Sequence, residues 1–254
     1  MLQQPVVHLT EVTCRQGHVT IVLGEPCLDA GDMRGKPHAV PEGDVARSIV
    51  QHAAEVQADL IVLCTHGHGR VRDVLSGAIA QQVVRLGSTP VLLQRPAEDG
   101  SAPPFAPQRL LVPLDATRAA EAALAPAATL ARLLGARVHL VMVVPTQGTA
   151  RDATAPLLPR TTQAMVALEQ QDAERYLERL ALQLRSPDLS VTTEVRQGGV
   201  AASLAAEAAE PGVGLVVVAT HGRSGLQAIW AGSVTAALLA RTRSPMLLLR
   251  TVED

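Results

Sequence analysis

Two glycines and two hydroxyl residues near the end of the chain have the spacing of a phosphate-binding loop. Gly222 follows the apolar run 214–218, and ten residues later the pair Gly232-Ser233 begins a predicted helix. The free N–H groups and the positive dipole end of a helix start favour a bound phosphate. Gly222 permits a tight turn and close backbone approach, and Ser233 and Thr235 add hydroxyl donors. This spacing indicates a site for a phosphate group.

A carboxylate, Asp115, ends a second predicted strand after the apolar run 109–114. Ligands of open α/β sheets bind beyond the carboxyl ends of strands, where the strand order reverses. Asp115 would lie there and accept hydrogen bonds from ribose hydroxyls. Taken alone, Gly222 also fits a turn and Ser233 a helix N-cap. Their coincidence with Asp115 favours a nucleotide site.

The second half of the chain alternates near-continuous apolar strands with helices. This pattern predicts a parallel sheet covered on both faces, with right-handed crossovers, and therefore a doubly wound, Rossmann-like α/β domain. Gly135 closes the first helix, in which Pro126 is expected to cause a kink. The predicted strands are 109–115, 136–145, 189–198, 214–222 and 244–250, and the predicted helices are 118–135, about 161–185, 200–210 and about 232–242.

The first half of the chain is a shortened copy of the second. Residues 41–95 align with 196–250 at a shift of 155 without a gap, with 17 identities in 55 positions, which indicates duplication. Ahead of this match the first copy is much shorter. Residues 5–24 are expected to supply its strands, with 18–26 matched to the strand at 190–198, and its sheet is expected to have fewer strands than the second.

The element pattern and the duplication predict two tandem α/β domains, the first truncated. The shortened domain spans 1–95, a linker rich in proline and alanine spans 96–108, and the complete domain spans 109–254.

Composition and charge argue against several classes of protein. The net charge of −2 gives no basic footprint for nucleic acid. Three cysteines fit reduced thiols in the cytosol. The N-terminus shows no signal peptide pattern, and the apolar runs are strand-sized, so we expect a cytoplasmic protein without a membrane span.

The order LLVPLD, THGRSG, GSV and SPMLLLR resembles the universal stress protein family, over about 109–250 in full and 18–95 in part. ATP-binding members of that family carry G-x-x-G-x9-G-[S/T], and tandem forms are common. The resemblance implies an adenine nucleotide as partner: ATP, with or without Mg²⁺. It implies ribose contact by Asp115 beside Pro113, adenine contact by the backbone of Val143, and a position against the base or sugar for Val218. It also implies phosphate contacts at Gly222, Gly232, Ser233, Val234 and Thr235, with Ala219 at the first position of the motif.

Both copies depart from the family pattern. Ala219 stands where the first glycine of the motif would be, and its methyl group either crowds the nucleotide or is tolerated. In the first copy Cys64 takes that position, Ala78 replaces the serine, and no strand ends in a counterpart of Asp115. We therefore expect one copy to bind and the other to support it.

The sequence favours a binding and signalling module over an enzyme. A P-loop needs a lysine, and the only lysine, Lys36, is far from any such loop. No catalytic residue is assigned, although slow ATP hydrolysis and a ligand-free interaction protein stay open as alternatives. Cys64, His66 and His68 form a conceivable zinc cluster, but short motifs often match by accident, so no metal site is expected.

The last strand of each half is apolar and would need a partner. We expect residues 89–95 and 244–250 to pair, which would join the two halves as a pseudo-dimer, because exposed apolar edge strands aggregate. The open face of the shortened half would then be available to another subunit in a homodimer.

Overall fold

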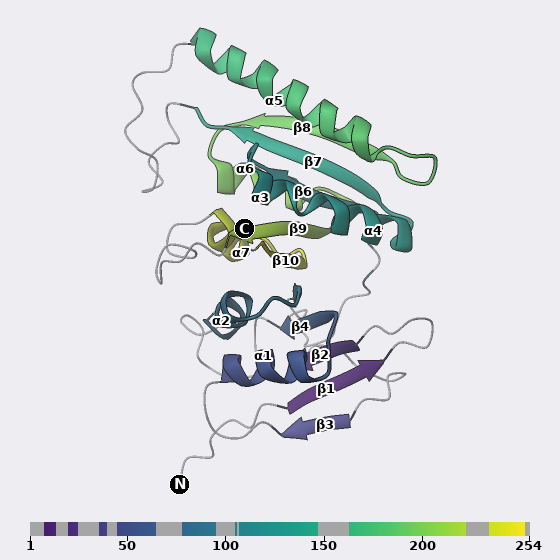
Figure 1. Ribbon diagram of the computed structural model, residues 1–254. Helices are drawn as coiled ribbons and strands as arrows, with labels where there is room; N and C mark the ends of the chain where they lie inside the picture. Colours follow the sequence, from purple (N-terminus) through teal and green to yellow (C-terminus); the bar gives the residue numbers. More distant parts are fainter. Residues whose placement is uncertain are drawn as a thin grey trace. The chain divides into compact units, whose positions relative to one another are not determined.

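A computed structural model describes residues 8–13, 20–24, 36–39, 45–64, 78–94, 105, 107–146, 163–221 and 234–251 (Figure 1). The chain divides into two compact units. One comprises residues 1–104 with 247–250, and the other comprises residues 105–246 with 251–254.

The second unit contains a parallel sheet in which four strands lie in the order β9-β6-β7-β8. These strands are β6 (Arg109–Leu114), β7 (Arg137–Val144), β8 (Val191–Gln197) and β9 (Val213–His221). The last strand, β10 (Met246–Thr251), follows Pro245, whose carbonyl accepts a hydrogen bond from the N–H of Val216 in β9 at 2.9 Å. The predicted doubly wound α/β fold is confirmed.

Helices cover both faces of this sheet. The chain moves from β6 to β7 to β8 and then returns to β9, so right-handed crossovers place the first helices on one face and the later ones on the other. In agreement, α4 and α5 pack on β6, β7 and β8, whereas α6 packs on all four strands and on α7 (Figure 1). The helices are α3 (Arg118–Glu121), α4 (Leu124–Leu134), α5 (Gln163–Leu184), α6 (Val200–Ala208) and α7 (Val234–Arg241).

The predicted helix 118–135 is broken into α3 and α4 at residues 122–123. Pro126 explains the break, because its ring clashes with the carbonyl four residues earlier, which belongs to Ala122. Gly135 ends α4 with a left-handed φ of 64° and donates from its N–H back into the helix, as predicted.

Small and branched side chains fill the core of the second unit. Leu110, Leu111 and Val112 of β6 are fully buried, as are Val138 and Leu140 of β7. Consecutive buried residues on one strand require cover on both faces. The cover comes from alanine-rich helices, which approach the sheet closely because their side chains are short.

The first unit has a mixed sheet with strand order β3-β1-β2-β4-β5. β2, β4 and β5 are parallel, whereas β1 is antiparallel to both of its neighbours. The expectation that residues 5–24 supply strands is confirmed by β1 and β2. The elements are β1 (His8–Thr13), β2 (Thr20–Gly24), β3 (Lys36–Ala39), α1 (Val45–Glu55), β4 (Leu60–Cys64), α2 (Ala78–Leu86) and β5 (Val91–Gln94).

The duplication is visible in the elements. The elements α1, β4, α2 and β5 begin within two residues of the positions that the 155-residue shift assigns to α6, β9, α7 and β10. Within the described parts, both halves therefore run helix, strand, helix, strand after the glycine that the copies share, Gly43 or Gly198.

Three expectations for the first half are wrong. Its described residues supply five strands, as many as the second half, because residues 36–39 form β3. Pro37 made this strand hard to predict, because proline is uncommon in strands. It is tolerated mainly in edge strands, and β3 is an edge strand. The match of 18–26 to the strand at 190–198 also fails, because β2 lies beside β4 as β6 lies beside β9. The first half therefore has a strand in the place of β6, contrary to the expectation that this strand is missing there.

The longest described helix, α5, has 22 residues and carries charged side chains along its length. Among the described residues, no helix is both long enough and apolar enough to span a membrane.

Candidate functional site

A tight turn after β6 holds the carboxylate of Asp115. Its Oδ1 accepts hydrogen bonds from the N–H of Thr117 at 3.0 Å and from the hydroxyl of Thr117 at 2.6 Å. The same hydroxyl accepts from the N–H of Ala120 at 3.2 Å, which makes Thr117 the N-cap of α3. Asp115 is exposed, and its Oδ2 accepts no hydrogen bond from the described residues. The turn thus orients the carboxylate and leaves Oδ2 without a hydrogen bond from the part of the chain that the structure describes.

The backbone of this turn is strained at Ala116. Its φ is 62°, a left-handed value that a side chain disfavours by about 1 kcal/mol or more. Non-glycine residues persist in such a conformation only where surrounding bonds hold them, here the two bonds from Thr117 to Asp115. Strain of this kind is concentrated at ligand sites, so the turn is a candidate for one.

Tyr176 ties α3 to α5 just beyond the turn. Its hydroxyl donates to Glu121 Oε1 at 2.9 Å. Burial raises the pKa of Tyr176, and the hydrogen bond to Glu121 and the charges of Glu121 and Asp115 raise it further. The hydroxyl therefore stays protonated at neutral pH and continues to donate, which fixes the helix that the turn enters.

The pairing of β6 with β9 ends before either strand does. The paired register runs from Arg109 to Leu111 on β6, although β6 continues to Leu114 and β9 to His221. The carbonyl of Gln108 accepts from Arg137 of β7, so the alternation of a parallel strand directs the nitrogen of Pro113 toward β9. Proline has no N–H to donate, and the ladder stops there.

The carboxyl ends of β9, β6 and β7 are the point where the strand order reverses, since β6 connects to β7 on one side and lies beside β9 on the other. This is where open α/β sheets bind ligands. The structure brings five of the predicted site residues to these ends. Pro113, Val218 and Ala219 are half-buried there, Val143 is buried, and Asp115 is exposed.

The other predicted site residues belong to the segment that leads into α7. Val234 is the first residue of α7 and is 43% exposed, and Thr235 is half-buried beside it. Gly222, Gly232 and Ser233 lie outside the described residues, as do His66 and His68 of the conceivable zinc cluster. Their assignments stay predictions.

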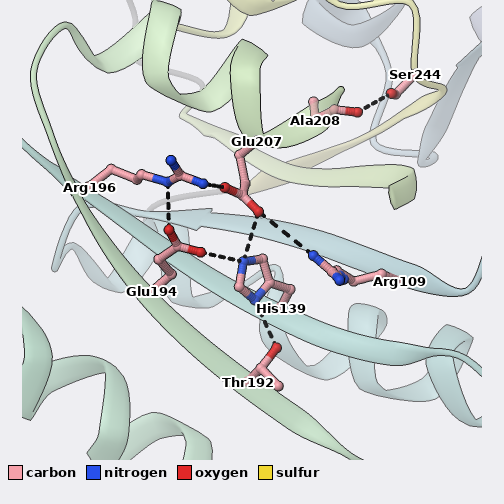
Figure 2. Close-up of polar contacts among 8 residues, drawn as sticks. All are labelled: Arg109, His139, Thr192, Glu194, Arg196, Glu207, Ala208 and Ser244. Carbon is pink, nitrogen blue, oxygen red and sulfur yellow. Dashed lines mark hydrogen bonds and ion pairs between the residues drawn. The ribbon is translucent and has the colours of Figure 1, made fainter. Parts of the chain in front are cut away.

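A buried ion-pair network lies beneath α6, on the face of the sheet that this helix covers (Figure 2). His139 of β7 is 5% exposed and Glu207 of α6 is 1% exposed. His139 Nε2 lies 3.1 Å from Glu207 Oε1, and His139 Nδ1 lies 2.8 Å from the hydroxyl of Thr192 in β8. These partners fit a neutral imidazole that donates from Nε2 to the carboxylate and accepts from the threonine.

Two guanidinium groups complete the network (Figure 2). Arg196 of β8 hydrogen-bonds Glu207 and places its Nε 2.7 Å from Glu194 Oε1. Arg109 of β6 lies 3.9 Å from Glu207 Oε1. Register explains the gathering, because alternate residues of β6, β7 and β8 point toward α6. Two carboxylates and two guanidinium groups balance, with the histidine neutral.

His139, Glu194 and Glu207 also offer ligand atoms within 4.8 Å of one another, as a metal site would require. Both carboxylates already contact Arg196, and a divalent cation would have to displace that guanidinium group. The cluster therefore fits an ion-pair network better than a metal centre.

Sequence reasoning missed this network. Its signals were a histidine inside the apolar strand RVHLVMVV and a glutamate inside the alanine-rich helix VAASLAAEA. Each residue alone is only a polar exception in an apolar element. Nothing local links the two, because 68 positions separate them in the sequence. The first half places His52 at the position that corresponds to Glu207, so the glutamate is not shared by the two copies.

The network is expected to make the stability of the second unit depend on pH. Burial lowers the pKa of His139 below its ordinary value of 6.5, and the charge of Glu207 offsets this only in part. The unfolded chain therefore takes up a proton at a higher pH than the folded chain does. Stability should be full above about pH 6.5 and should fall as the pH drops from there toward the folded-state pKa.

This prediction can be checked by measuring the free energy of unfolding from about pH 8 to about pH 5. His139→Gln keeps an amide that can donate to Glu207 and cannot titrate. We expect the variant to lose less stability than the wild type over this range. Equal pH dependence in both proteins would show that His139 does not contribute.

The sequence model of the universal stress protein family matches residues 29–95 and 107–250 of this chain. Universal stress proteins Rv2005c of Mycobacterium tuberculosis and Mb2028c of Mycobacterium bovis are each 33% identical over 196 residues, which is 76% of this chain. The match covers 62% of the length of these relatives.

Solved structures share the fold. A universal stress protein from Archaeoglobus fulgidus has a TM-score of 0.57 at 16% identity, over 82% of this chain and 66% of that one. A putative universal stress protein from Pseudomonas aeruginosa has a TM-score of 0.58 at 15% identity, over 81% of this chain and 68% of that one.

Proposed function

Because this chain belongs to the universal stress protein family, we propose that its second half binds ATP and acts as a ligand-controlled signalling module rather than as a catalyst. The observation that carries the proposal is the Asp115 turn. A carboxylate held by Oδ1, with Oδ2 open, stands at the carboxyl end of β6 where the ladder to β9 has stopped.

The residues around this point suit the parts of an adenine nucleotide. Asp115 Oδ2 can accept a hydrogen bond from a ribose hydroxyl. The backbone at Val143 would meet the adenine, and Val218 would lie against the base or sugar. These groups lie at the ends of three adjacent strands, so a ligand can touch them all at once.

The phosphates would bind at the start of α7. A helix start offers N–H donors with about half a positive charge. Gly232, Ser233, Val234 and Thr235 would contact the phosphate oxygens. On the facing segment, Ala219 and Gly222 would approach them.

We place one nucleotide in the second half and none in the first. The residues at the first-half positions of Ala219 and Ser233 are Cys64 and Ala78, which removes one hydroxyl donor. We also propose that the protein is cytoplasmic and that its two halves pair through residues 89–95 and 244–250.

Asp115→Asn tests the role of the carboxylate. The asparagine oxygen can still accept from Thr117, whereas its NH₂ group replaces the free acceptor. Losing a hydrogen bond to a charged group costs roughly 1.5–3 kcal/mol, so ATP affinity should fall about ten- to a hundredfold. Calorimetric titration with ATP measures the change.

A ligand without ribose hydroxyls sharpens this test. The wild type should bind 2′,3′-dideoxy-ATP more weakly than ATP, and Asp115→Asn should not distinguish the two. The matched control is Asp188→Asn, an exposed aspartate that pairs with Arg132 before β8 and should leave ATP affinity unchanged. Equal ATP affinity in wild type and Asp115→Asn would refute the assignment.

A further inference from the structure

The helix α5 carries large apolar side chains on both of its faces. Its inner face packs on β7 and β8 (Figure 1). On that face Ala173, Leu177, Leu180 and Ala181 are at most 2% exposed. On the outer face, Met165 is 49% exposed, Leu168 56% and Leu182 64%. A surface helix normally presents polar residues to solvent, so three large apolar side chains there need a reason.

The outer residues have the spacing of a helix-pairing seam. Together with the charged residues between them, they alternate intervals of three and four, which keeps one stripe facing a partner helix along a two-stranded pair. Charged residues stand in the middle of the stripe and apolar residues near its ends. The stripe, called the α5 seam below, consists of Met165, Leu168, Asp172, Arg175, Arg179 and Leu182.

The α5 seam is complementary to itself when reversed. Its positions are symmetric about the point between residues 173 and 174. An antiparallel second copy therefore places Met165 against Leu182 of the partner subunit. It also places Leu168 against Arg179 of the partner subunit, and Asp172 against Arg175 of the partner subunit.

The charges favour the antiparallel direction. Asp172 and Arg175 already form an ion pair within α5, and their side chains stay 60% and 72% exposed. Reversal of the second helix would continue this alternation across the pair. A parallel partner would instead set Asp172 against Asp172 and Arg175 against Arg175, where like charges repel.

The remaining seam residue, Arg179, suits an apolar neighbour. Its guanidinium carbon lies 5.4 Å from the centre of the Tyr176 ring, which occupies the charged end. The methylene stem of an arginine can cover apolar surface, here Leu168 of the partner subunit. At the flank, Glu178 is paired with Arg185 at 2.8 Å.

We propose that the α5 seam is a docking surface for a second copy of this chain, with the two α5 helices antiparallel. The inference does not depend on nucleotide binding. A 22-residue helix is about 33 Å long, and a single helix pair buries less area than most stable dimers. The dimer is therefore expected to be weak and to dissociate on dilution.

Charge reversal tests this arrangement by sedimentation velocity on the full chain at high micromolar concentration. Asp172→Arg and Arg175→Asp should each shift the protein toward monomer, because each sets like charges against each other in the dimer. The double variant should dimerise again. An equimolar mixture of the two single variants should also dimerise, since one chain then carries two arginines at the centre and the other two aspartates.

If the mixture dimerises, a folding defect in either variant cannot be the reason that each variant alone is monomeric. An independent variant, Leu182→Glu, should weaken the dimer, whereas the control Ala202→Glu on the exposed side of α6 should not. A wild type that stays monomeric at every concentration would overturn the proposal. So would an oligomer that the charge variants, their mixture and Leu182→Glu leave unchanged.

Discussion

Replacing Glu207 with glutamine should lower the free energy of unfolding of the second unit by roughly 2–4 kcal/mol. Glu207 is 1% exposed and is the carboxylate that Arg196, Arg109 and His139 share. Glutamine keeps the shape but removes the charge and turns an NH₂ group toward donors. Breaking a buried pair leaves its partners uncompensated. The loss stays below the upper end of such cases because both guanidinium groups are about one-third exposed.

Intrinsic fluorescence during chemical denaturation at neutral pH measures this change. The single tryptophan, Trp230, and the single tyrosine, Tyr176, both lie in the second half, so the signal follows that unit. Glu194→Gln is the matched control. Its side chain is 38% exposed, and its loss should cost under about 1 kcal/mol. Equal stabilities for the two variants would mean that burial of Glu207 has no energetic consequence.

Gly232→Val should remove ATP binding from the chain while leaving it folded. In the proposed site this glycine lies two residues before α7, where the phosphates approach the helix start. A branched side chain there would occupy the place of a phosphate and cost several charge-assisted hydrogen bonds. Even one such loss lowers affinity about ten- to a hundredfold, so we expect a fall of about a hundredfold or more.

Titration of ATP into Gly232→Val gives the affinity, and its denaturation curve reports folding. The duplication provides a matched control, because Gly77 is the corresponding residue of the first half. Gly77→Val makes the same chemical change at a helix that we do not expect to bind nucleotide, so its affinity should equal that of the wild type. Undiminished binding by Gly232→Val, or a loss caused by Gly77→Val, would contradict the assignment.

Much of the second unit could be predicted because its local signals agree with its fold. The strand 137–144 is apolar throughout, and a strand buried on both faces has that composition. Gly135 ends a helix where a left-handed residue is needed. Pro126 indicated an irregular helix, and only the position of the break, at residues 122–123, required the structure. The duplication then allowed the element order of the second half to be predicted for residues 41–95 as well.

The first unit and the buried network were harder to predict for physical reasons. The strand 36–39 contains Pro37 and has no apolar alternation, and it forms because β1 offers an open edge. His139 and Glu207 meet only because β7 and α6 pack in the folded sheet. Such a contact is a property of topology and register, and a local sequence pattern does not contain it.

The candidate site shows the same division. Asp115 and Pro113 were assigned from the sequence as residues beside a ligand. The reason that Pro113 matters, the end of the β6–β9 ladder after Leu111, follows from the direction of its nitrogen in the sheet. The open Oδ2 of Asp115 likewise depends on the two bonds from Thr117.

The stoichiometry of ATP binding to the full chain shows whether the second half alone binds a nucleotide. Calorimetric titration with ATP, with and without Mg²⁺, gives the number of sites per chain. One nucleotide per chain is the predicted result, because in the proposed site the residues that would bind it, Asp115 and Gly232, both belong to the second half. No heat of binding would show that Ala219 or another departure has abolished the site, and two nucleotides per chain would show that the first half binds as well. Either result would refute a single nucleotide site in the second half.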